Sequence, residues 1–408
     1  MKNLIIAQSG GPTVAINASL AGVLKQNKIS NTFGTIYGAL NGITGIVNQH
    51  FLDLTEAVAK DENFIEELKH TPAMFLGSCR FKVPSEENDA AFYETVFKVF
   101  EEKNVGAFFY IGGNDSMDTV DKLSAYAKKH GKDVSIIGIP KTIDNDLVHI
   151  DHTPGFGSAA KYVASSILEL AHDTYIYHLK SVTIVEIMGR DAGWLTASSV
   201  LARNEYSAAP HLIYLPEKPF DIHECIEDTK KLLETQENVI IAVSEGIRDK
   251  DGNYVSASEA KTDNFGHAML SGVAKYLEAK LHDELGVKTR GIEMNTLQRC
   301  AAHIASETDL SESMNLGATA VSLCEKGETG VMATLTRESD DPYKVTYGCH
   351  PVCEIANEVK SVPNDFINDK GNDVTDKMIA YLKPLILGEP NLTYENGIPK
   401  YLNISHLL

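Results

Sequence analysis

The stretch Ala107-Phe108-Phe109-Tyr110-Ile111-Gly112-Gly113-Asn114-Asp115-Ser116 joins an apolar run to a glycine turn that carries a carboxylate. Five consecutive apolar residues bounded by glycines predict a strand that is buried on both faces of a parallel sheet. The next apolar run, 134–139, ends in a second polar turn, Pro140-Lys141-Thr142-Ile143-Asp144-Asn145-Asp146. Because open parallel sheets bind ligands beyond the carboxyl ends of their strands, the two turns predict one shared site.

Similar apolar runs alternate with amphipathic stretches of helical length, which is typical of repeated βαβ units. Further strands are expected at Lys2–Gln8, Ser181–Ile187, His211–Leu215 and Asn238–Val243. Helices are expected at Ala15–Gln26, Ser116–His130, Gly157–His172, Gly193–Arg203, Ile222–Thr235 and Asn264–Leu285. The pattern predicts an α/β fold with two doubly wound, Rossmann-like parallel-sheet domains and a C-terminal appendage.

The length of 408 residues exceeds what one hydrophobic core usually serves, which favours two domains. No linker rich in Pro, Gly or Ser separates them, so the boundary is inferred from the spacing of the elements. We expect domains at residues 1–150 and 151–325, with residues 326–408 packing back on the core. Within that last segment, Thr329–Thr336 is strand-like.

The chain is acidic, with 37 Lys and Arg against 56 Asp and Glu and a formal net charge of -19. This balance argues against nucleic acid or an anionic membrane as the main partner. No stretch of about 18 apolar residues predicts a membrane span, and the apolar run at the N-terminus is too short for a signal peptide. We therefore expect a cytoplasmic protein, in which a polyphosphate ligand would need locally gathered cations or a divalent metal.

The cysteines and two histidines are candidate metal ligands by residue type. Cys349-His350-Pro351-Val352-Cys353 places two thiols and an imidazole within five residues, but no second cluster in the sequence completes a tetrahedral zinc set. We interpret the cysteines as reduced thiols. His149 and His152 are interpreted as loop histidines near a functional turn.

The glycine turns and the acidic turn have both a functional and a plain explanation. Ser9-Gly10-Gly11-Pro12 follows a strand and opens a helix, where backbone amides can receive a phosphate, although paired glycines at a strand end are more often only a tight turn. Gly112-Gly113 repeats this arrangement of a strand, a double glycine and a helix. In Lys141–Asp146, carboxylates beside a lysine are costly to desolvate unless a metal or substrate uses them. The alternative is a solvated turn, since Asp and Asn favour turns.

Polar groups also follow the later strands. Arg190, in Met188-Gly189-Arg190, can bind an anion with its planar guanidinium group. Glu245, in Ser244-Glu245-Gly246, suits sugar hydroxyls. Arg290 and Arg299 could clamp a terminal phosphate. A surface ion pair is the alternative for each.

Taken in order, six motifs resemble those of the 6-phosphofructokinases over about residues 1–330. They are Gly10-Gly11-Pro12, Gly112–Ser116, Pro140–Asp146, Met188-Gly189-Arg190, Ser244-Glu245-Gly246 and Gln298-Arg299. The resemblance implies transfer of a phosphoryl group to the 1-hydroxyl of fructose 6-phosphate with Mg²⁺. It also implies donor binding by residues 1–150, fructose 6-phosphate binding by residues 151–325, and a homodimer or homotetramer.

Site residues follow from the resemblance, with Asp144 as the general base. The residues expected to act in catalysis are Asp144, Lys141, Asp115 and Arg190. Fructose 6-phosphate is expected to contact Thr142, Asp144, Asp146, Met188, Gly189, Arg190, Glu245, Arg290, Thr296 and Arg299. The donor is expected to contact Gly11, Arg80, Gly113 and Ser116, and Mg²⁺ to bind Asn114 and Asp115.

The choice of donor depends on Asp115 and Lys141, a combination similar to the diphosphate-dependent branch of the family. A carboxylate at 115 would lie where the α-phosphate of a nucleotide must pass, while Lys141 offsets the charge of a smaller, denser anion. The expected function is therefore a reversible diphosphate–fructose-6-phosphate 1-phosphotransferase. An ATP-dependent 6-phosphofructokinase remains an alternative, because some ATP users share the lysine, and sedoheptulose 7-phosphate remains a possible additional acceptor.

Three positions depart from the family pattern. Asn114 stands where an Asp is usual, Thr296 where a His or Tyr is common, and Ser181 where an Arg is frequent, with Lys180 adjacent. Two other protein classes are disfavoured. A silent regulatory subunit would not need the acidic turn and Arg190, and a dinucleotide oxidoreductase would need a Gly-x-Gly-x-x-Gly turn that is not evident.

Overall fold

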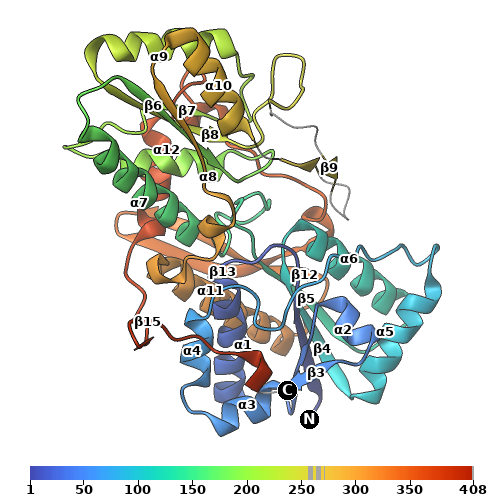
Figure 1. Cartoon of the computed structure of the whole chain (residues 1–408). Helices are drawn as coiled ribbons and strands as arrows, with labels where there is room; N and C mark the ends of the chain where they lie inside the picture. The colour runs from blue at the N-terminus through green and yellow to red at the C-terminus, as the bar shows by residue number, and fades with distance from the viewer. Residues whose placement is uncertain (256–260, 263–267, 271, 407–408) are drawn as a thin grey trace.

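The computed structural model describes residues 1–255, 261–262, 268–270 and 272–406. The chain forms two lobes, each built around one large β-sheet (Figure 1). A seven-stranded sheet lies in the lobe that contains the N-terminus, and a four-stranded sheet lies in the other. The predicted α/β fold with two parallel-sheet domains is confirmed. Among the described residues, no helix is long and apolar enough to cross a membrane.

The first sheet has the strand order β13-β12-β5-β4-β1-β2-β3. Its strands are β1 (Asn3–Gln8), β2 (Ile36–Ala39), β3 (Phe51–Asp53), β4 (Val105–Gly112), β5 (Ser135–Pro140), β12 (Val331–Asp340) and β13 (Tyr343–Pro351). Only the edge strands β3 and β13 pair in antiparallel fashion. The register of β4 and β5 places Gly112 opposite Pro140, so the two predicted turns leave the sheet side by side.

Helices cover both faces of this sheet, which explains why Phe108 and Phe109 of β4 are both fully buried. The helices are α1 (Ile16–Ser30), α2 (Ile43–Val47), α3 (Leu54–Lys60), α4 (Phe64–His70), α5 (Ala90–Glu102), α6 (Asn114–Lys129) and α11 (Glu307–Glu325). Helix α11 packs closely on α1. A Cβ on Gly317 would lie 2.0 Å from the Ser19 carbonyl oxygen, so only glycine permits this approach.

The second sheet has the order β11-β6-β8-β7, with parallel neighbours throughout. Its strands are β6 (Ser181–Ile187), β7 (Leu212–Tyr214), β8 (Asn238–Ser244) and β11 (Lys288–Glu293). The main helices of this lobe are α7 (Phe156–Tyr175), α8 (Trp194–Ala197), α9 (Ile222–Thr235) and α10 (Val273–Leu285). The predicted helix Asn264–Leu285 begins only at Val273. Strand β10 (Ala268–Met269) pairs with β9 (Lys261–Thr262), and residues 264–267 and 271 lie outside the described residues.

The C-terminal region is part of both lobes. Strand β12 pairs in parallel with β5, and β13 completes a hairpin beside it, so both strands extend the first sheet. The chain then crosses to the second lobe, where α12 (Asp376–Leu382) contributes Met378 and Leu382 to the core. The short hairpin β14 (Tyr394–Glu395) and β15 (Ile398–Pro399) follows.

Candidate active site

A cavity of about 560 Å³ lies beyond the carboxyl ends of β4, β5, β6 and β8. Both predicted turns line it, together with groups that follow β6 and β8. The predicted site residues that line the cavity are Gly11, Arg80, Gly113, Asn114, Asp115, Ser116, Lys141, Thr142, Asp144, Asp146, Met188, Gly189, Arg190, Glu245 and Arg299. The strand-end motifs of the sequence therefore meet in one place.

The Gly10-Gly11 turn lies against two cations. Gly10 has a φ of 83°, and a Cβ there would lie 3.2 Å from Nζ of Lys141. A Cβ on Gly11 would lie 3.3 Å from Nη1 of Arg299. Side chains at these positions would crowd both cationic groups. The two glycines thus keep a lysine and an arginine accessible beside backbone amides.

The turn after β4 is packed tightly at its base. A Cβ on Gly112 would lie 1.9 Å from Oγ of Ser116, and that hydroxyl hydrogen-bonds Oγ of Ser9 at 3.1 Å. Asp115 lies in the first turn of α6, where unpaired amides and the helix dipole stabilise negative charge. The carboxylate is therefore held at the edge of the cavity without needing a salt bridge.

Asn114 contacts the C-terminal region through both ends of its amide. Its Oδ1 accepts from the N–H of Asn357, and its Nδ2 donates to the carbonyl oxygen of Glu358, both at 2.5 Å. An aspartate could accept the first bond but could not donate the second. The departure from the family pattern at 114 therefore matches a contact that requires an amide.

The turn after β5 begins with a buried lysine. Lys141 is 3% exposed, and its backbone N–H donates to the carbonyl oxygen of Gly112 at 2.9 Å, which joins the two turns. Burial lowers the pKa of Lys141 to about 8, although the nearby charges of Asp144, Asp146 and Asp115 act in the opposite direction. An anionic ligand would favour the charged form.

The carboxylates of this turn face the cavity. Burial raises the pKa of Asp144, while the positive charges of Arg190, Lys141 and Arg299 oppose that shift. The N–H of Asp144 also donates to Oγ1 of Thr142 at 3.1 Å. A carboxyl group with a raised pKa among cations is a suitable proton acceptor.

Asp146 lies two residues further along the same turn. Burial raises its pKa to about 6, and the negative charge of Asp144 adds to the shift. Two acids this close disfavour double ionisation, so each raises the affinity of the other for a proton.

Glu245 holds the loop that follows β6 at one side of the cavity. Its Oε1 accepts from the N–H groups of Gly189 (3.3 Å) and Arg190 (3.2 Å). Both donors have positive φ, 141° and 49°, so the loop is turned back onto the carboxylate. Burial, followed by the charge of Asp144, raises the pKa of Glu245 to about 7. A Cβ on Gly246 would lie 1.6 Å from the Arg190 carbonyl oxygen, so this corner requires glycine.

The cavity lining contains five cationic side chains and five carboxylates, so it is less acidic than the whole protein, whose formal net charge is -19. The cationic side chains that line it are Arg80, Lys82, Lys141, Arg190 and Arg299. This local gathering can bind phosphorylated ligands despite the acidic composition.

Comparison with known proteins agrees with this arrangement. The sequence profile of the family described as Phosphofructokinase matches residues 3–324. The chain belongs to the phosphofructokinase family.

Relatives of this phosphofructokinase match it over nearly its whole length. It is similar to a pyrophosphate–fructose 6-phosphate 1-phosphotransferase of Xanthomonas campestris, with 40% identity, 99% coverage of this chain and 96% of the relative. A protein of the same name from Halomonas elongata is 38% identical, with the same coverage. The crystal structure of a pyrophosphate-dependent phosphofructokinase from Nitrosospira multiformis superposes with a TM-score of 0.88 and 36% identity, covering 98% of this chain and 96% of that one.

Two predicted ligands of this phosphofructokinase lie outside the cavity. Arg290 is in the middle of the edge strand β11, opposite Thr183, and its half-exposed side chain lies 3.9 Å from Asp173. Thr296 is exposed in the short 3-10 turn Asn295–Arg299. The predicted clamp of Arg290 with Arg299 is therefore not assembled within one chain, because a mid-strand residue does not reach the strand-end edge.

Other residues of the cavity were not named as individual site residues, although Gly10, Pro12 and Ile143 belong to the predicted motifs. The full set is Gly10, Pro12, Lys82, Ile143, Asp191, Ala192, Tyr254, Leu270, Asn357 and Val359. The alternation Arg80-Phe81-Lys82 could have indicated Lys82, since residues i and i+2 of an extended segment share a face. Asn357 and Val359 carry no such signal, because only the path of the C-terminal region brings them to the cavity.

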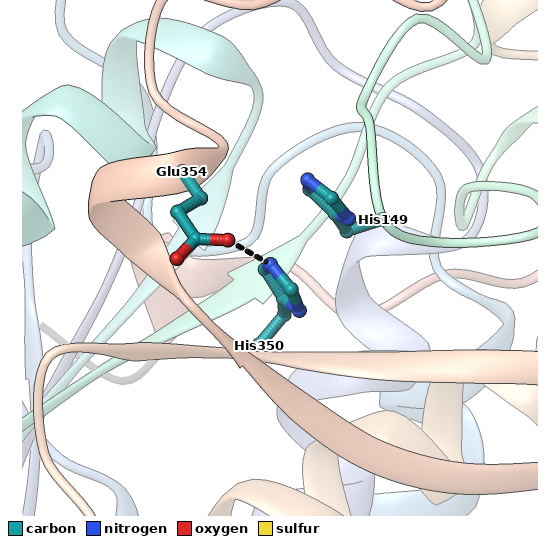
Figure 2. Close-up of side chains that lie close together, drawn as sticks. All are labelled: His149, His350 and Glu354. Atoms are coloured by element: carbon teal, nitrogen blue, oxygen red, sulfur yellow. Dashed lines mark hydrogen bonds and ion pairs between the residues drawn. The ribbon is translucent and has the colours of Figure 1, made fainter.

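The Cys349–Cys353 segment, considered above as a metal motif, does not have the arrangement expected of a zinc site. His350 hydrogen-bonds Glu354 (Nε2 to Oε2, 2.8 Å) and stacks on His149 (Figure 2). Potential ligand atoms of these three residues lie within 4.8 Å of one another. However, the imidazole centroids are 3.8 Å apart with planes only 12° from parallel, so their in-plane lone pairs do not converge on one point. We therefore assign no ion to this cluster.

His152 lies in a loop, as predicted, and is buried there. It is 3% exposed and bridges Oδ1 of Asp151 and Oε2 of Glu312, each at 2.7 Å. Burial alone would lower the pKa of His152, but the hydrogen bonds to the two carboxylates raise it overall. The histidine therefore joins the loop after the turn 140–146 to helix α11.

Proposed function

We propose that this phosphofructokinase transfers a phosphoryl group from diphosphate to the 1-hydroxyl of fructose 6-phosphate, giving fructose 1,6-bisphosphate and phosphate. The names of relatives that are 38% and 40% identical over almost the whole chain support this function. The observation that carries it is the presence of Asp115 and Lys141 at the phosphate-binding end of the cavity.

Asp115 and Lys141 select a small, dense anion. Lys141 lies against the Gly10-Gly11 turn, where its ammonium group can bind a terminal phosphate. Asp115 disfavours a nucleotide, because an α-phosphate beside this carboxylate would be repelled in a partly desolvated site. Diphosphate has no such extension.

Fructose 6-phosphate binds on the side of β6 and β8. Arg299 pairs with its phosphate, and Glu245 accepts from sugar hydroxyls. The backbone bonds from Gly189 and Arg190 to Glu245 hold that carboxylate in place. The sugar is thus positioned with its 1-hydroxyl towards Asp144.

In the transfer step, the sugar 1-oxygen attacks one phosphorus of diphosphate in line with the bridging oxygen. A new C–O–P linkage forms, the P–O–P bond breaks, and the hydroxyl proton moves to Asp144. Lys141 and Arg190 stabilise the charge that develops on the transferring group. In the reverse direction Asp144 returns the proton to the sugar oxygen.

Magnesium fits the donor side of the cavity. Hard divalent cations prefer oxygen ligands, and Asp115 provides a carboxylate there. Asn114 offers less, because its carbonyl oxygen already accepts from Asn357. When bound with diphosphate, Mg²⁺ would reduce the charge of the donor. Asp115 is therefore the main protein ligand in this proposal.

Arg290 and Thr296 bind fructose 6-phosphate only if they reach the cavity of a second subunit. Arg290 lies beside Tyr177, which is 48% exposed, and near Ile176, which is 66% exposed. Exposed apolar groups next to Arg290 support a homodimer or homotetramer.

The products test this function directly. With fructose 6-phosphate, diphosphate and Mg²⁺, ³¹P NMR should show inorganic phosphate and a sugar bisphosphate newly phosphorylated at oxygen 1. Fructose 1,6-bisphosphate with phosphate should regenerate diphosphate. Hydrolysis of diphosphate without a sugar bisphosphate would refute the proposal.

A further inference from the structure

The chain between β13 and α12 reaches the active site, although its sequence contains no recognisable motif. Ile355 packs in the core of the first lobe and Val362 in the core of the second, so the intervening residues pass between the lobes (Figure 1). Asn357 and Val359 line the cavity on the way. We call residues 357–360 the crossing segment.

Lys360 ends the crossing segment and attaches it to the catalytic turn. Its Nζ donates to the carbonyl oxygens of Asp151 (2.8 Å) and Ile150 (3.1 Å) and to Oδ1 of Asn145 (3.2 Å). These acceptors use all three N–H groups of an ammonium. The backbone N–H of Lys360 also donates to the carbonyl oxygen of Asp146 at 2.8 Å. One residue is therefore joined to the turn through both its side chain and its backbone.

Asn145 is the residue that these contacts hold in place. It lies between Asp144 and Asp146, is 0% exposed, and has a φ of 55° in the left-handed region. Asparagine adopts this region more readily than most non-glycine residues because its short polar side chain can hydrogen-bond locally. Here the side chain is buried, so its hydrogen bonds decide how the turn is held. Besides the bond from Lys360, the Nδ2 of Asn145 donates to the hydroxyl of Tyr381 at 2.9 Å. Two of its partners thus come from the C-terminal region.

The charge of Lys360 acts on the same turn. Burial and then the charge of Asp144 raise the pKa of Asp146, whereas Lys360 and Arg190 oppose this shift. Lys360 does not line the cavity, so it affects the carboxylates without contacting a ligand there.

We propose that Lys360 is a positioning residue that holds Asn145 in its left-handed conformation and thereby fixes the carboxylate of Asp144. The C-terminal region is then part of the catalytic machinery. This inference rests on the proposed function in that it takes Asp144 to be the base. A misplacement of about 1 Å at a reacting group can cost roughly 10²-fold in rate, so the loss of this contact should be measurable.

The test is Lys360→Met, which removes the ammonium group and keeps most of the side-chain volume. We expect kcat to fall about 10- to 100-fold in both directions. The KM values for fructose 6-phosphate and diphosphate should stay within about threefold, because Lys360 contacts neither substrate. A role limited to stability would lower the yield of folded protein and leave kcat per folded molecule unchanged.

Lys161→Met is the matched control. Nζ of Lys161 donates to the carbonyl oxygens of Ala305 (3.2 Å) and Gly388 (2.6 Å), so it fastens the C-terminal region to α7 away from the cavity. This variant should lower Tm and keep kcat within about twofold. The only tryptophan, Trp194, reports on folding around Lys360 because its Nε1 donates to the Lys360 carbonyl oxygen at 2.8 Å.

A kcat of Lys360→Met within twofold of the wild type would overturn the inference, as would an equal loss of kcat in Lys161→Met. If Lys360→Met does not fold, Tyr381→Phe removes the other C-terminal contact to Asn145. We then expect kcat to fall a few-fold at unchanged KM, and an unchanged kcat would refute the positioning role. The kcat of each variant relative to the wild type can be measured with any donor that supports activity. Wild-type turnover with diphosphate therefore tests the proposed function separately.

Discussion

The two turns that form the floor of the cavity leave adjacent strands in register, yet they are held in different ways. In the turn after β4, Asp115 is partly exposed, and the side chain of Asn114 is engaged with the crossing segment. In the turn after β5, Lys141 and Asn145 are buried. In the proposed function, Asp115 of the partly open turn acts with Lys141 to select the donor, and the buried turn holds the base Asp144. Substitution of Asp115 should therefore change donor specificity, and substitution of Asp144 should change the rate.

The largest effect is expected in the buried turn. Asp144→Ser should lower kcat by about 10³-fold or more, because it removes both a proton acceptor and its positioning. The KM values should change only a few-fold, which steady-state kinetics would measure. Asp133→Ser, at a fully solvated surface position, is the control and should leave kcat and KM unchanged. Near-normal turnover of Asp144→Ser would eliminate Asp144 as the base.

The second effect concerns donor choice, which involves Asp115 of the open turn and Lys141 of the buried turn. Asp115→Gly combined with Lys141→Gly should lower kcat/KM for diphosphate by about 10²-fold, since it removes a metal ligand and a phosphate-binding cation. Turnover with ATP should rise above that of the wild type, because the carboxylate that repels an α-phosphate is removed. If ATP use does not increase, the steric and electrostatic account of donor choice is wrong.

A smaller effect is expected where the open turn contacts the crossing segment. Asn114→Asp replaces the bond to the Glu358 carbonyl with a repulsive contact between two oxygens. We expect a loss of about 1–3 kcal/mol in the free energy of unfolding, measured in denaturant. Asn315→Asp, at an exposed hydrogen bond to Tyr347, is the matched control and should change stability less. Equal stability of the two variants would show that the Asn114 contact contributes little.

The smallest effect involves the pH dependence of stability. The pKa of Glu245 is about 7 in the folded protein and 4.5 in the unfolded chain, so the folded state binds the proton more tightly. Stability should therefore fall as the pH rises from 4.5 through 7. Glu245→Gln keeps the acceptor for Gly189 and Arg190 and removes this penalty. At pH 8 it should be more stable by roughly 1–3 kcal/mol, although inactive. A Glu245→Gln variant that is less stable than the wild type at pH 8 would contradict the predicted direction of this change.

The strands that carry the motifs were predictable because burial on both faces leaves continuous apolar runs. The expected strand 107–111 lies within β4, and the run 181–187 matches β6. Strands β2 and β3 were missed because their sequences, Ile-Tyr-Gly-Ala and Phe-Leu-Asp, do not form a continuous apolar run of strand length. Most of the cavity followed from the sequence for a related reason: glycines and charged groups directly after buried strands must meet at one edge of the sheet.

The contribution of the C-terminal region could not be read from the sequence. Lys360 lies in a polar stretch, where a lysine is usually solvated, and only the crossing between lobes brings it to Asn145. The contacts of Asn114 depend on the same crossing. Arg290 is a different case. The family resemblance indicated a ligand, but its position in the middle of β11 keeps it away from the cavity of its own chain, so its predicted role stays a prediction that requires a second subunit.

The central claim is that Asp115 and Lys141 make diphosphate the donor. The most direct test compares kcat/KM for diphosphate and for ATP, using the wild-type protein with saturating fructose 6-phosphate and Mg²⁺. The account predicts rapid turnover with diphosphate and no turnover with ATP above background. Turnover with ATP and none with diphosphate would contradict it.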